Sequence, residues 1–213
     1  MQVPERYKYY KWKKTMSKII EKPVFGIEGH ITIWDPDNGE ILVRRRNAIN
    51  YENMSIALAN LLANEAGGVG TYAIAQMRFG NGGTIIDGLG AVTYKATNTN
   101  ITSGALYNQT YAQTVDETIT GSATNSVEVT HTSGELYSDV VVTCTLDYNQ
   151  PSGQDTLDTS VNMNGTYVFD ELALYTANNT MLTHVIFHPV QKSANRKIQV
   201  IYTLRIRTSY SDV

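Results

Sequence analysis

The C-terminal segment constrains the fold most, because apolar and polar side chains alternate there with a period of two. The alternating apolar residues are Ile198, Val200, Tyr202, Leu204 and Ile206. This period is typical of an antiparallel strand with one buried face. Two more strands are predicted over 166–176 and 181–187, joined by a turn at 177–180. The three strands are expected to form a meander, with a loop at 189–195 before the last one.

Near the N-terminus, two apolar runs at 24–34 and 40–44 flank a segment that contains Pro36 and the pair Asn38-Gly39. Proline presets one turn angle, and glycine adopts the positive φ that a tight turn requires. These features predict a β-hairpin.

One amphipathic helix is predicted between residues 47 and 66, with its regular part at about 50–65. Its apolar residues have helical spacing and would form a single stripe: Met54, Ala57, Leu58, Leu61 and Leu62. Asn50 is suited to the N-cap, and Gly67-Gly68 to the C-terminal stop.

Together these elements predict a mainly β fold, either an antiparallel β-sandwich or a flattened barrel, with that one helix. We expect a single domain over 23–213, preceded by an extended arm over 1–22. The domain would carry an insertion rich in threonine and asparagine at about 85–135, where only short strands are predicted. The glycines at 80–83 match no phosphate-binding motif and predict a tight turn.

The net charge of −3 conceals a strong asymmetry along the chain. Residues 1–22 hold seven basic groups and two acidic ones, whereas between Phe79 and Gln191 one lysine faces eleven carboxylates. Aromatic residues alternate with the bases of the arm, and we expect it to order against a partner. The docking residues would be Arg6, Tyr7, Lys8, Tyr9, Tyr10, Lys11, Trp12, Lys13 and Lys14.

We expect the partner of the arm to be an acidic protein surface and not nucleic acid. The arm is short, and the acidic body would repel a phosphate backbone. The alternative is a solvated, frayed terminus.

No arrangement of residues indicates catalysis, so we expect neither an enzyme nor a bound cofactor or metal. His184 and His188 would lie roughly 13 Å apart on a strand, too far to share one ion, and are expected to be core or surface residues. Cys144 lies in an apolar run and is expected to be a buried small residue. The sequence contains no run of eighteen apolar residues, which a membrane-spanning helix would need. The N-terminus does not resemble an export signal.

Asp170 and Glu171 interrupt an otherwise apolar strand, and at least one of them should need a partner. A structural ion pair with Arg205 or Arg207 on a nearby strand is the favoured interpretation. A ligand site is the alternative.

Three segments, in this order, resemble a group of virion proteins of tailed bacteriophages. They are the helix at 47–63, the strand and glycine turn at 74–84, and the closing strands at 169–206 with FDELALYT, MLTHVIFHPVQKS and KIQVIYTLRI. The resemblance covers about half of the chain. It implies a structural role in the head, neck, tail, baseplate or fibre attachment.

The function expected from these features is that of a structural subunit in the neck, tail or baseplate of such a virion. Its partners would be other virion proteins and copies of itself, with the arm docked on a neighbouring subunit. The chain would be made in the host cytoplasm and incorporated into the particle. Two alternatives are a capsid decoration protein and a receptor-binding adhesin module, in which the loops of 85–135 would contact a host-surface glycan.

Overall fold

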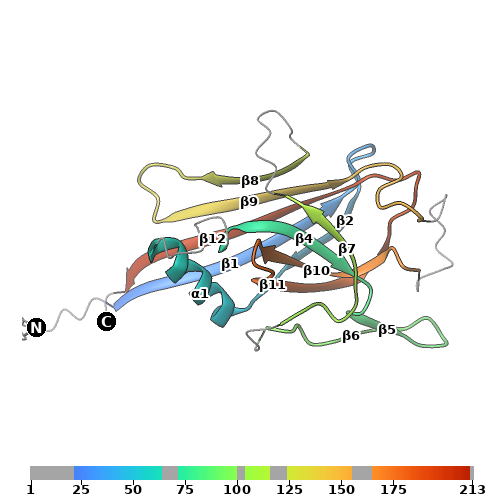
Figure 1. The fold of residues 1–213 in the computed structure, drawn as a ribbon, viewed down its shortest axis with the longest axis horizontal. Helices are drawn as coiled ribbons and strands as arrows, with labels where there is room; N and C mark the ends of the chain where they lie inside the picture. Colours follow the sequence, from blue (N-terminus) through green and yellow to red (C-terminus); the bar gives the residue numbers. More distant parts are fainter. Residues whose placement is uncertain (1–21, 64–71, 100–103, 116–123, 155–164, 212–213) are drawn as a thin grey trace, which may run out of the picture.

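The computed structural model describes residues 22–63, 72–99, 104–115, 124–154 and 165–211. These residues form two five-stranded sheets and a small hairpin, with antiparallel pairing throughout (Figure 1). We call the first sheet the long sheet; its strands in spatial order are β2 (Ile41–Arg46), β1 (Lys22–Trp34), β12 (Ile198–Ser211), β9 (Tyr137–Leu146) and β8 (Asn125–Thr130).

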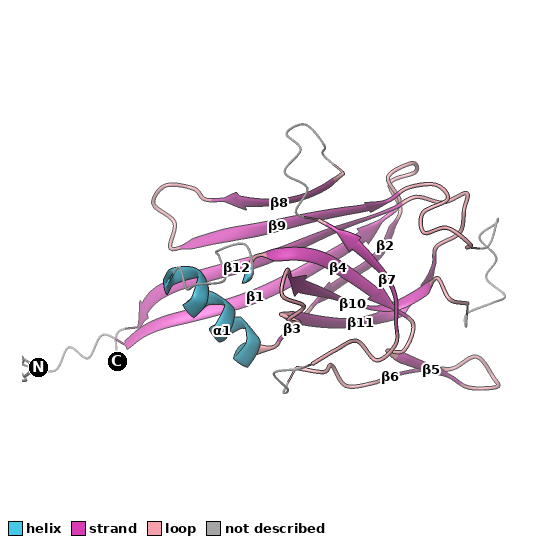
Figure 2. Ribbon diagram, viewed as in Figure 1, coloured by secondary structure: helices cyan, strands magenta, loops and turns pink. Residues whose placement is uncertain are grey.

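The second sheet, called the short sheet, packs against one face of the long sheet. Its strands in spatial order are β3 (Ala48–Ile49), β11 (Thr183–Gln191), β10 (Val168–Thr176), β4 (Ile74–Gly80) and β7 (Gln109–Thr114). Helix α1 (Tyr51–Ala63) lies beside the strands at one end of the molecule (Figure 2).

The core lies between the two sheets and is built by both of them. Ile31, Val142 and Val200 of the long sheet pack in one cluster with Phe79 and Leu174 of the short sheet, and all five are fully buried. The predicted antiparallel β-sandwich is therefore confirmed. The flattened barrel is not found, because no strand pairing among the described residues joins the two sheets into a closed wall.

The predicted N-terminal hairpin is present as β1 and β2. In its turn, the side chain of Asp35 accepts a hydrogen bond from the backbone N–H of Asp37 at 2.9 Å, and the Asp35 carbonyl accepts one from Gly39 at 2.8 Å. Gly39 adopts a φ of 77°, the positive value for which glycine is suited. The local turn chemistry thus specifies this connection, as the sequence indicated.

The helix begins at Tyr51, directly after the predicted N-cap, and its described part runs to Ala63. Asn50 is its N-cap, since its side-chain oxygen accepts a hydrogen bond from the backbone N–H of Asn53 at 3.2 Å. Met54 and Ala57 are buried, whereas Leu62 is 87% exposed, so the predicted stripe is covered only in its first half. The predicted stop at Gly67-Gly68 lies outside the described residues.

The three closing strands do not form the predicted meander. β10 and β11 form the expected hairpin, in which the Thr176 and Thr180 backbones are hydrogen-bonded at 3.0 Å. β12, however, crosses to the long sheet and lies between β1 and β9. An alternating pattern predicts one buried face, but it does not say which neighbours a strand will have. Pro189 is part of β11, at a shift in register, and not of a loop.

The segment predicted as an insertion contributes to both sheets. β7 is an edge strand of the short sheet, and β8 is an edge strand of the long sheet. β5 (Thr84–Ile86) and β6 (Val92–Tyr94) form the separate hairpin. Leu106 packs on Ala173 and Tyr175 of β10 in a cluster distinct from the main core. Part of this segment therefore covers the outer face of the short sheet.

Candidate functional site

The nine arm residues predicted to dock on a partner lie within residues 1–21, outside the described part of the chain. Their role stays a prediction. The described chain begins at Lys22, which is the first residue of β1.

The predicted ion pair between Asp170 or Glu171 and one of two arginines is wrong. Asp170 and Glu171 belong to β10 of the short sheet, whereas Arg205 and Arg207 belong to β12 of the long sheet. The hydrophobic core separates these two strands. The prediction failed because it assumed that β10 and β12 were neighbours in one meander.

Arg205 and Arg207 instead pair across the outer face of the long sheet. The guanidinium of Arg205 donates two hydrogen bonds of 2.7 Å to the two carboxylate oxygens of Asp139, and its Cζ lies 3.9 Å from the ring centre of Tyr137. Arg207 approaches Glu28 to 2.6 Å. All of these partners lie on adjacent strands of the long sheet.

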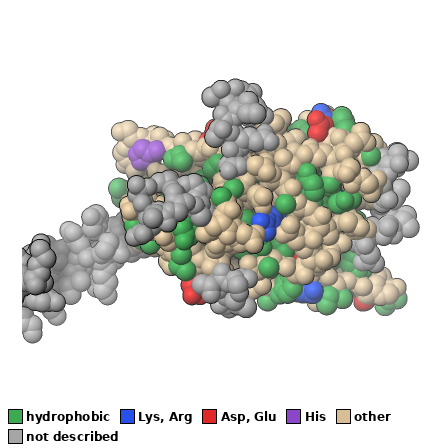
Figure 3. All heavy atoms as spheres, in the orientation of Figure 1, with side chains coloured by type: hydrophobic (Ala, Val, Ile, Leu, Met, Phe, Trp, Pro, Cys, Tyr) green, Lys and Arg blue, Asp and Glu red, His purple; other side chains and the backbone are tan. Residues whose placement is uncertain are grey.

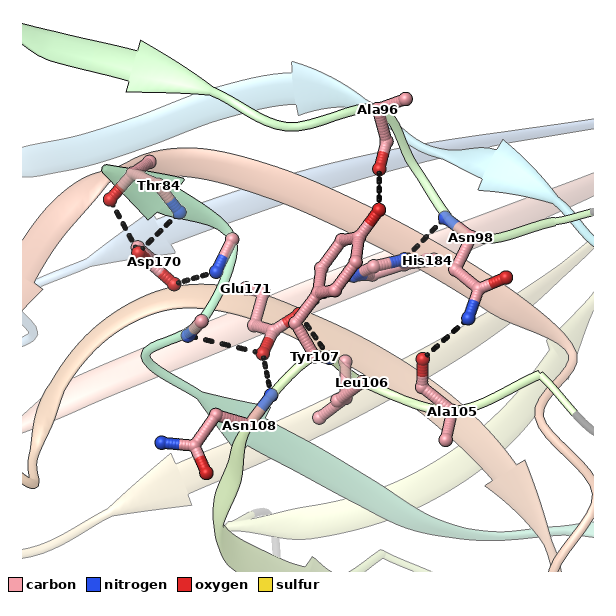
Figure 4. Close-up of polar contacts among 12 residues, drawn as sticks. Thr84, Ala96, Asn98, Ala105, Leu106, Tyr107, Asn108, Asp170, Glu171 and His184 are labelled. Carbon is pink, nitrogen blue, oxygen red and sulfur yellow. Dashed lines mark hydrogen bonds and ion pairs between the residues drawn. The ribbon is translucent and has the colours of Figure 1, made fainter.

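Asp170 binds the glycine turn that follows β4 (Figure 4). Its carboxylate accepts hydrogen bonds from the backbone N–H groups of Gly83 and Thr84, at 2.8 and 2.7 Å, and from the Thr84 hydroxyl. A Cβ atom on the adjacent Gly82 would lie 2.7 Å from the backbone nitrogen of Asn108, so the close approach of the two segments requires glycine there. The predicted tight turn is found as a bend between β4 and β5, and its backbone N–H groups serve as hydrogen-bond donors to a buried carboxylate.

Glu171 binds three backbone amides and one imidazole. Its two oxygens accept hydrogen bonds from the N–H groups of Gly82, Tyr107 and Asn108, at 3.2, 3.0 and 2.8 Å, and lie 3.0 Å from Nε2 of His184. Glu171 and His184 are both fully buried. Consecutive side chains of a regular strand point to opposite faces of the sheet, but the pairing of β10 with β11 shifts register between Phe169 and Glu171. This irregularity allows the carboxyls of Asp170 and Glu171 both to lie under the covering loops.

His184 connects this cluster to the loop that follows β6 (Figure 4). Its Nδ1 accepts a hydrogen bond of 2.8 Å from the backbone N–H of Asn98, so the donor to Glu171 is the proton on Nε2. The ring of Tyr107 covers His184 with 5.9 Å between the ring centres, and its hydroxyl donates to the carbonyl of Ala96 at 2.8 Å. His184 is a core residue and His188 is an exposed one, a distinction that the sequence did not make.

The two carboxyls differ in the direction of their pKa shifts. Burial raises the pKa of Asp170, because the hydrogen bonds from Thr84 and Gly83 only partly offset its lost solvation. Burial also acts to raise the pKa of Glu171, but hydrogen bonds from His184 and from two backbone amides outweigh it, and the pKa is lowered.

This buried cluster has the chemistry of an anchor. Glu171 and His184 are both occupied by hydrogen bonds to the loops above them, and no hydroxyl or thiol nucleophile is hydrogen-bonded to His184 among the described residues. No group of three or more metal-ligating side chains is present in the described part of the chain. We therefore assign Asp170, Glu171 and His184 the role of fixing the loops on the outer face of the short sheet.

A groove of about 350 Å³ opens on that same face, beside the anchored loop. It is lined by residues of β4, β7 and β10 and by loop residues, among them Arg78, Tyr175, Ala105, Gln109, Asn179 and Thr180. The guanidinium carbon of Arg78 lies 3.9 Å from the ring centre of Tyr175. Arg78 donates to Gln76 at 2.9 and 2.7 Å and to Gln109 at 3.3 Å, and it forms no ion pair with a described carboxylate.

A buried cation lies just after β11. Lys192 is 1% exposed, and its Nζ donates to the carbonyl of Ser193 at 2.8 Å and to the side-chain oxygen of Gln154 at 3.1 Å. Burial lowers the pKa of Lys192 to about 8. Nothing in the sequence indicated the burial of Lys192, because a lysine in a polar segment is typical of a solvated position.

Sequence reasoning identified part of this site correctly. Two acids within an apolar strand indicated a need for partners, and that need is real. The partners were missed because they are backbone N–H groups of distant loops, which leave no mark on residue type. Arg78 and Tyr175 lie in two of the segments that carry the resemblance, but nothing in the sequence singled out either of them as a site residue. Cys144 is fully buried, as predicted.

No protein-family model matches this chain, and no curated protein or solved structure matches it either. Among the described residues, no helix combines the length and the apolar character needed to cross a membrane.

Proposed function

We propose that this chain is a structural subunit of a tailed-phage virion in the neck, tail or baseplate region, assembling through protein–protein contacts. The resemblance of the helix, glycine turn and closing strands to virion proteins supports this proposal. So does the use of the buried polar side chains, which fix loops. In the view of Figure 3, charged side chains are few and scattered among uncharged ones. Depletion of charge is typical of surfaces that neighbouring subunits bury.

The observation that carries the proposal is an uncovered part of the inner face of the long sheet. Phe25 lies on the same side of β1 as the buried Ile31 and Ile33, yet it is 58% exposed. Val129 on β8 pairs with Val140 and shares this side, and it is 72% exposed. β1 and β12 extend beyond the strands of the short sheet at the end where α1 lies (Figure 1). This apolar overhang is suited to a partner.

The arm would start at this overhang. The described chain begins at Lys22, at the free end of β1 and three residues from Phe25. Twenty-one extended residues span up to about 70 Å, which is enough to reach an adjacent molecule. Four aromatic residues in the arm, at positions 7, 9, 10 and 12, would supply apolar surface for the overhang of a neighbouring copy.

Removal of residues 1–21 tests this role. We expect the truncated protein to remain folded, with an unchanged circular dichroism spectrum, and to be absent from purified particles of the phage that encodes it. A matched full-length variant in which Tyr7, Tyr9, Tyr10 and Trp12 are replaced by serine should also fail to incorporate, as should Phe25→Ser. Normal incorporation of the serine variant would contradict docking through the aromatic residues.

Copy number per particle tests the location. Mass spectrometry of purified particles should find about six or twelve copies for a neck or baseplate subunit. Hundreds of copies would instead favour the capsid decoration protein. Absence of the protein from mature particles would overturn both.

A further inference from the structure

We propose that the groove at Arg78, on the outer face of the short sheet, binds the carboxylate of an acidic sugar. This site is separate from the arm and the overhang, and it does not depend on the proposed role in the virion. It also differs from an adhesin built from loops alone, because its central residue belongs to a strand in the interior of the sheet.

The guanidinium of Arg78 is held ready to receive an anion. β4 lies between β7 and β10, so the backbone of Arg78 is fixed on both sides. Its Nε and both Nη atoms donate to the amide oxygens of Gln76 and Gln109, and the plane rests over the ring of Tyr175. A guanidinium has five N–H donors. Three are used within the described residues, which leaves two for a carboxylate.

The rest of the groove suits hydroxyl groups. Gln109, Asn179 and Thr180 offer amide and hydroxyl groups, and Ala105 contributes only a small side chain. The volume of about 350 Å³ fits a monosaccharide or the end of a short glycan. The neighbouring loop is preorganised, because Glu171 binds the amides of residues 107 and 108.

The charge around the groove favours a ligand with a single carboxylate over a polyanion. Arg78 is the one charged side chain among the described residues that line the groove. A nucleic acid or a heavily sulfated chain needs several cations in a row, whereas one guanidinium matches one carboxylate. Uronic acids and sialic acids share this chemistry, and the experiment distinguishes between them.

The test measures binding of the full-length protein to three immobilised oligosaccharides and to heparin. The oligosaccharides end in glucuronic acid, in N-acetylneuraminic acid or in glucose. We expect binding to one or both of the carboxylated glycans, at least about tenfold tighter than to the neutral one. Which of the two acids binds identifies the class. Equal binding to the neutral glycan, tighter binding to heparin, or no binding to either acidic glycan would overturn the proposal.

Two variants connect such binding to Arg78. Arg78→Gln should weaken binding to the carboxylated glycan about tenfold or more. Ala105→Glu changes an exposed residue of the groove lining and should abolish binding, because a carboxylate in the lining repels the carboxylate of the glycan. Arg44→Gln, which removes an exposed arginine of the long sheet, is the matched control and should bind as the parent does. If circular dichroism shows that Arg78→Gln is misfolded, the test relies on Ala105→Glu. Unchanged glycan binding by Ala105→Glu would then refute the proposed site.

Discussion

Charged side chains are arranged differently on the outer faces of the two sheets. On the long sheet, Arg205 and Asp139 pair side chain to side chain at the surface, across neighbouring strands. On the short sheet, loops cover the face, and the carboxylates of Asp170 and Glu171 are buried beneath them.

The difference shows what burial demands of a charge. A surface pair keeps much of its hydration, so one opposite charge is sufficient and its net contribution is small. A buried carboxylate has lost its water and must have every oxygen occupied by donors. Glu171 obtains these donors from three backbone amides and His184, and as a result the loops that carry them are held in place.

The largest effect is expected at Glu171. Glu171→Gln replaces an acceptor oxygen with an NH2 group that faces backbone donors, and it should lower the free energy of unfolding by about 3 kcal/mol at pH 7. Urea denaturation measures this. The pKa of Glu171 is lowered by folding, so its contribution is present above the unfolded pKa, near 4.3, and is lost as the pH falls through the folded pKa. The difference in the free energy of unfolding between the parent and Glu171→Gln should therefore become smaller in acid.

Asp170→Asn is the matched control for that pH dependence. Because folding raises the pKa of Asp170, its contribution is greatest below the unfolded pKa and is lost as the pH rises through the folded pKa. The difference in the free energy of unfolding between the parent and Asp170→Asn should therefore become larger in acid. This trend is opposite to the one expected for Glu171→Gln. The same trend in both variants would show that the two carboxyls are not distinguished by their surroundings.

The next effect is expected at Lys192, which precedes the crossing from the short to the long sheet. With a pKa lowered to about 8, the unfolded chain binds more protons between about pH 8 and 10.5, so the stability of the parent should rise with pH in that window. Lys192→Met should lack this rise and be more stable at pH 7 by about 2 kcal/mol, after allowance for two lost hydrogen bonds.

Chemical denaturation of both proteins at pH 7 and pH 10 measures the change at Lys192. Lys197→Met, which removes a partly exposed lysine, should retain the rise between the two pH values. If the stability of the parent falls between pH 7 and pH 10, the buried charge of Lys192 does not destabilise the folded protein as predicted.

The smallest effect is expected at the surface pair. The Arg205 guanidinium holds the pKa of Asp139 below its usual value, yet Asp139→Asn should shift the urea midpoint much less than Glu171→Gln does. The remaining difference should disappear in 1 M salt, where the screening length is about 3 Å. A shift as large as that at Glu171 would remove the distinction between the two faces.

The parts of the fold that sequence predicted are those with local causes. The turn after Trp34 follows from Asp35 and Gly39, and the start of α1 follows from the side chain of Asn50. In each case, the residues that interact are within five positions of one another. Periodicity likewise identified the strands, because a buried face leaves its mark at every second residue.

The candidate site could be predicted only in part, because its contacts join distant segments. Glu171 is bound by amides 63, 64 and 89 positions away. A backbone N–H is the same for nearly every residue type, so its use as a donor cannot be inferred from composition. The predicted pairing with Arg205 or Arg207 chose partners by opposite charge and by the assumption that their strand was a neighbour of β10.

By itself, the sequence determined a mainly β chain with a capped helix, a tight N-terminal hairpin and two acids that require partners. Only the tertiary structure decided that β12 belongs to the long sheet, that Glu171 binds loop amides, and that Arg78 lies in an open groove. The physical reason is that periodicity and turn chemistry act over a few residues. Partner choice depends instead on which distant segments the burial of apolar surface brings together.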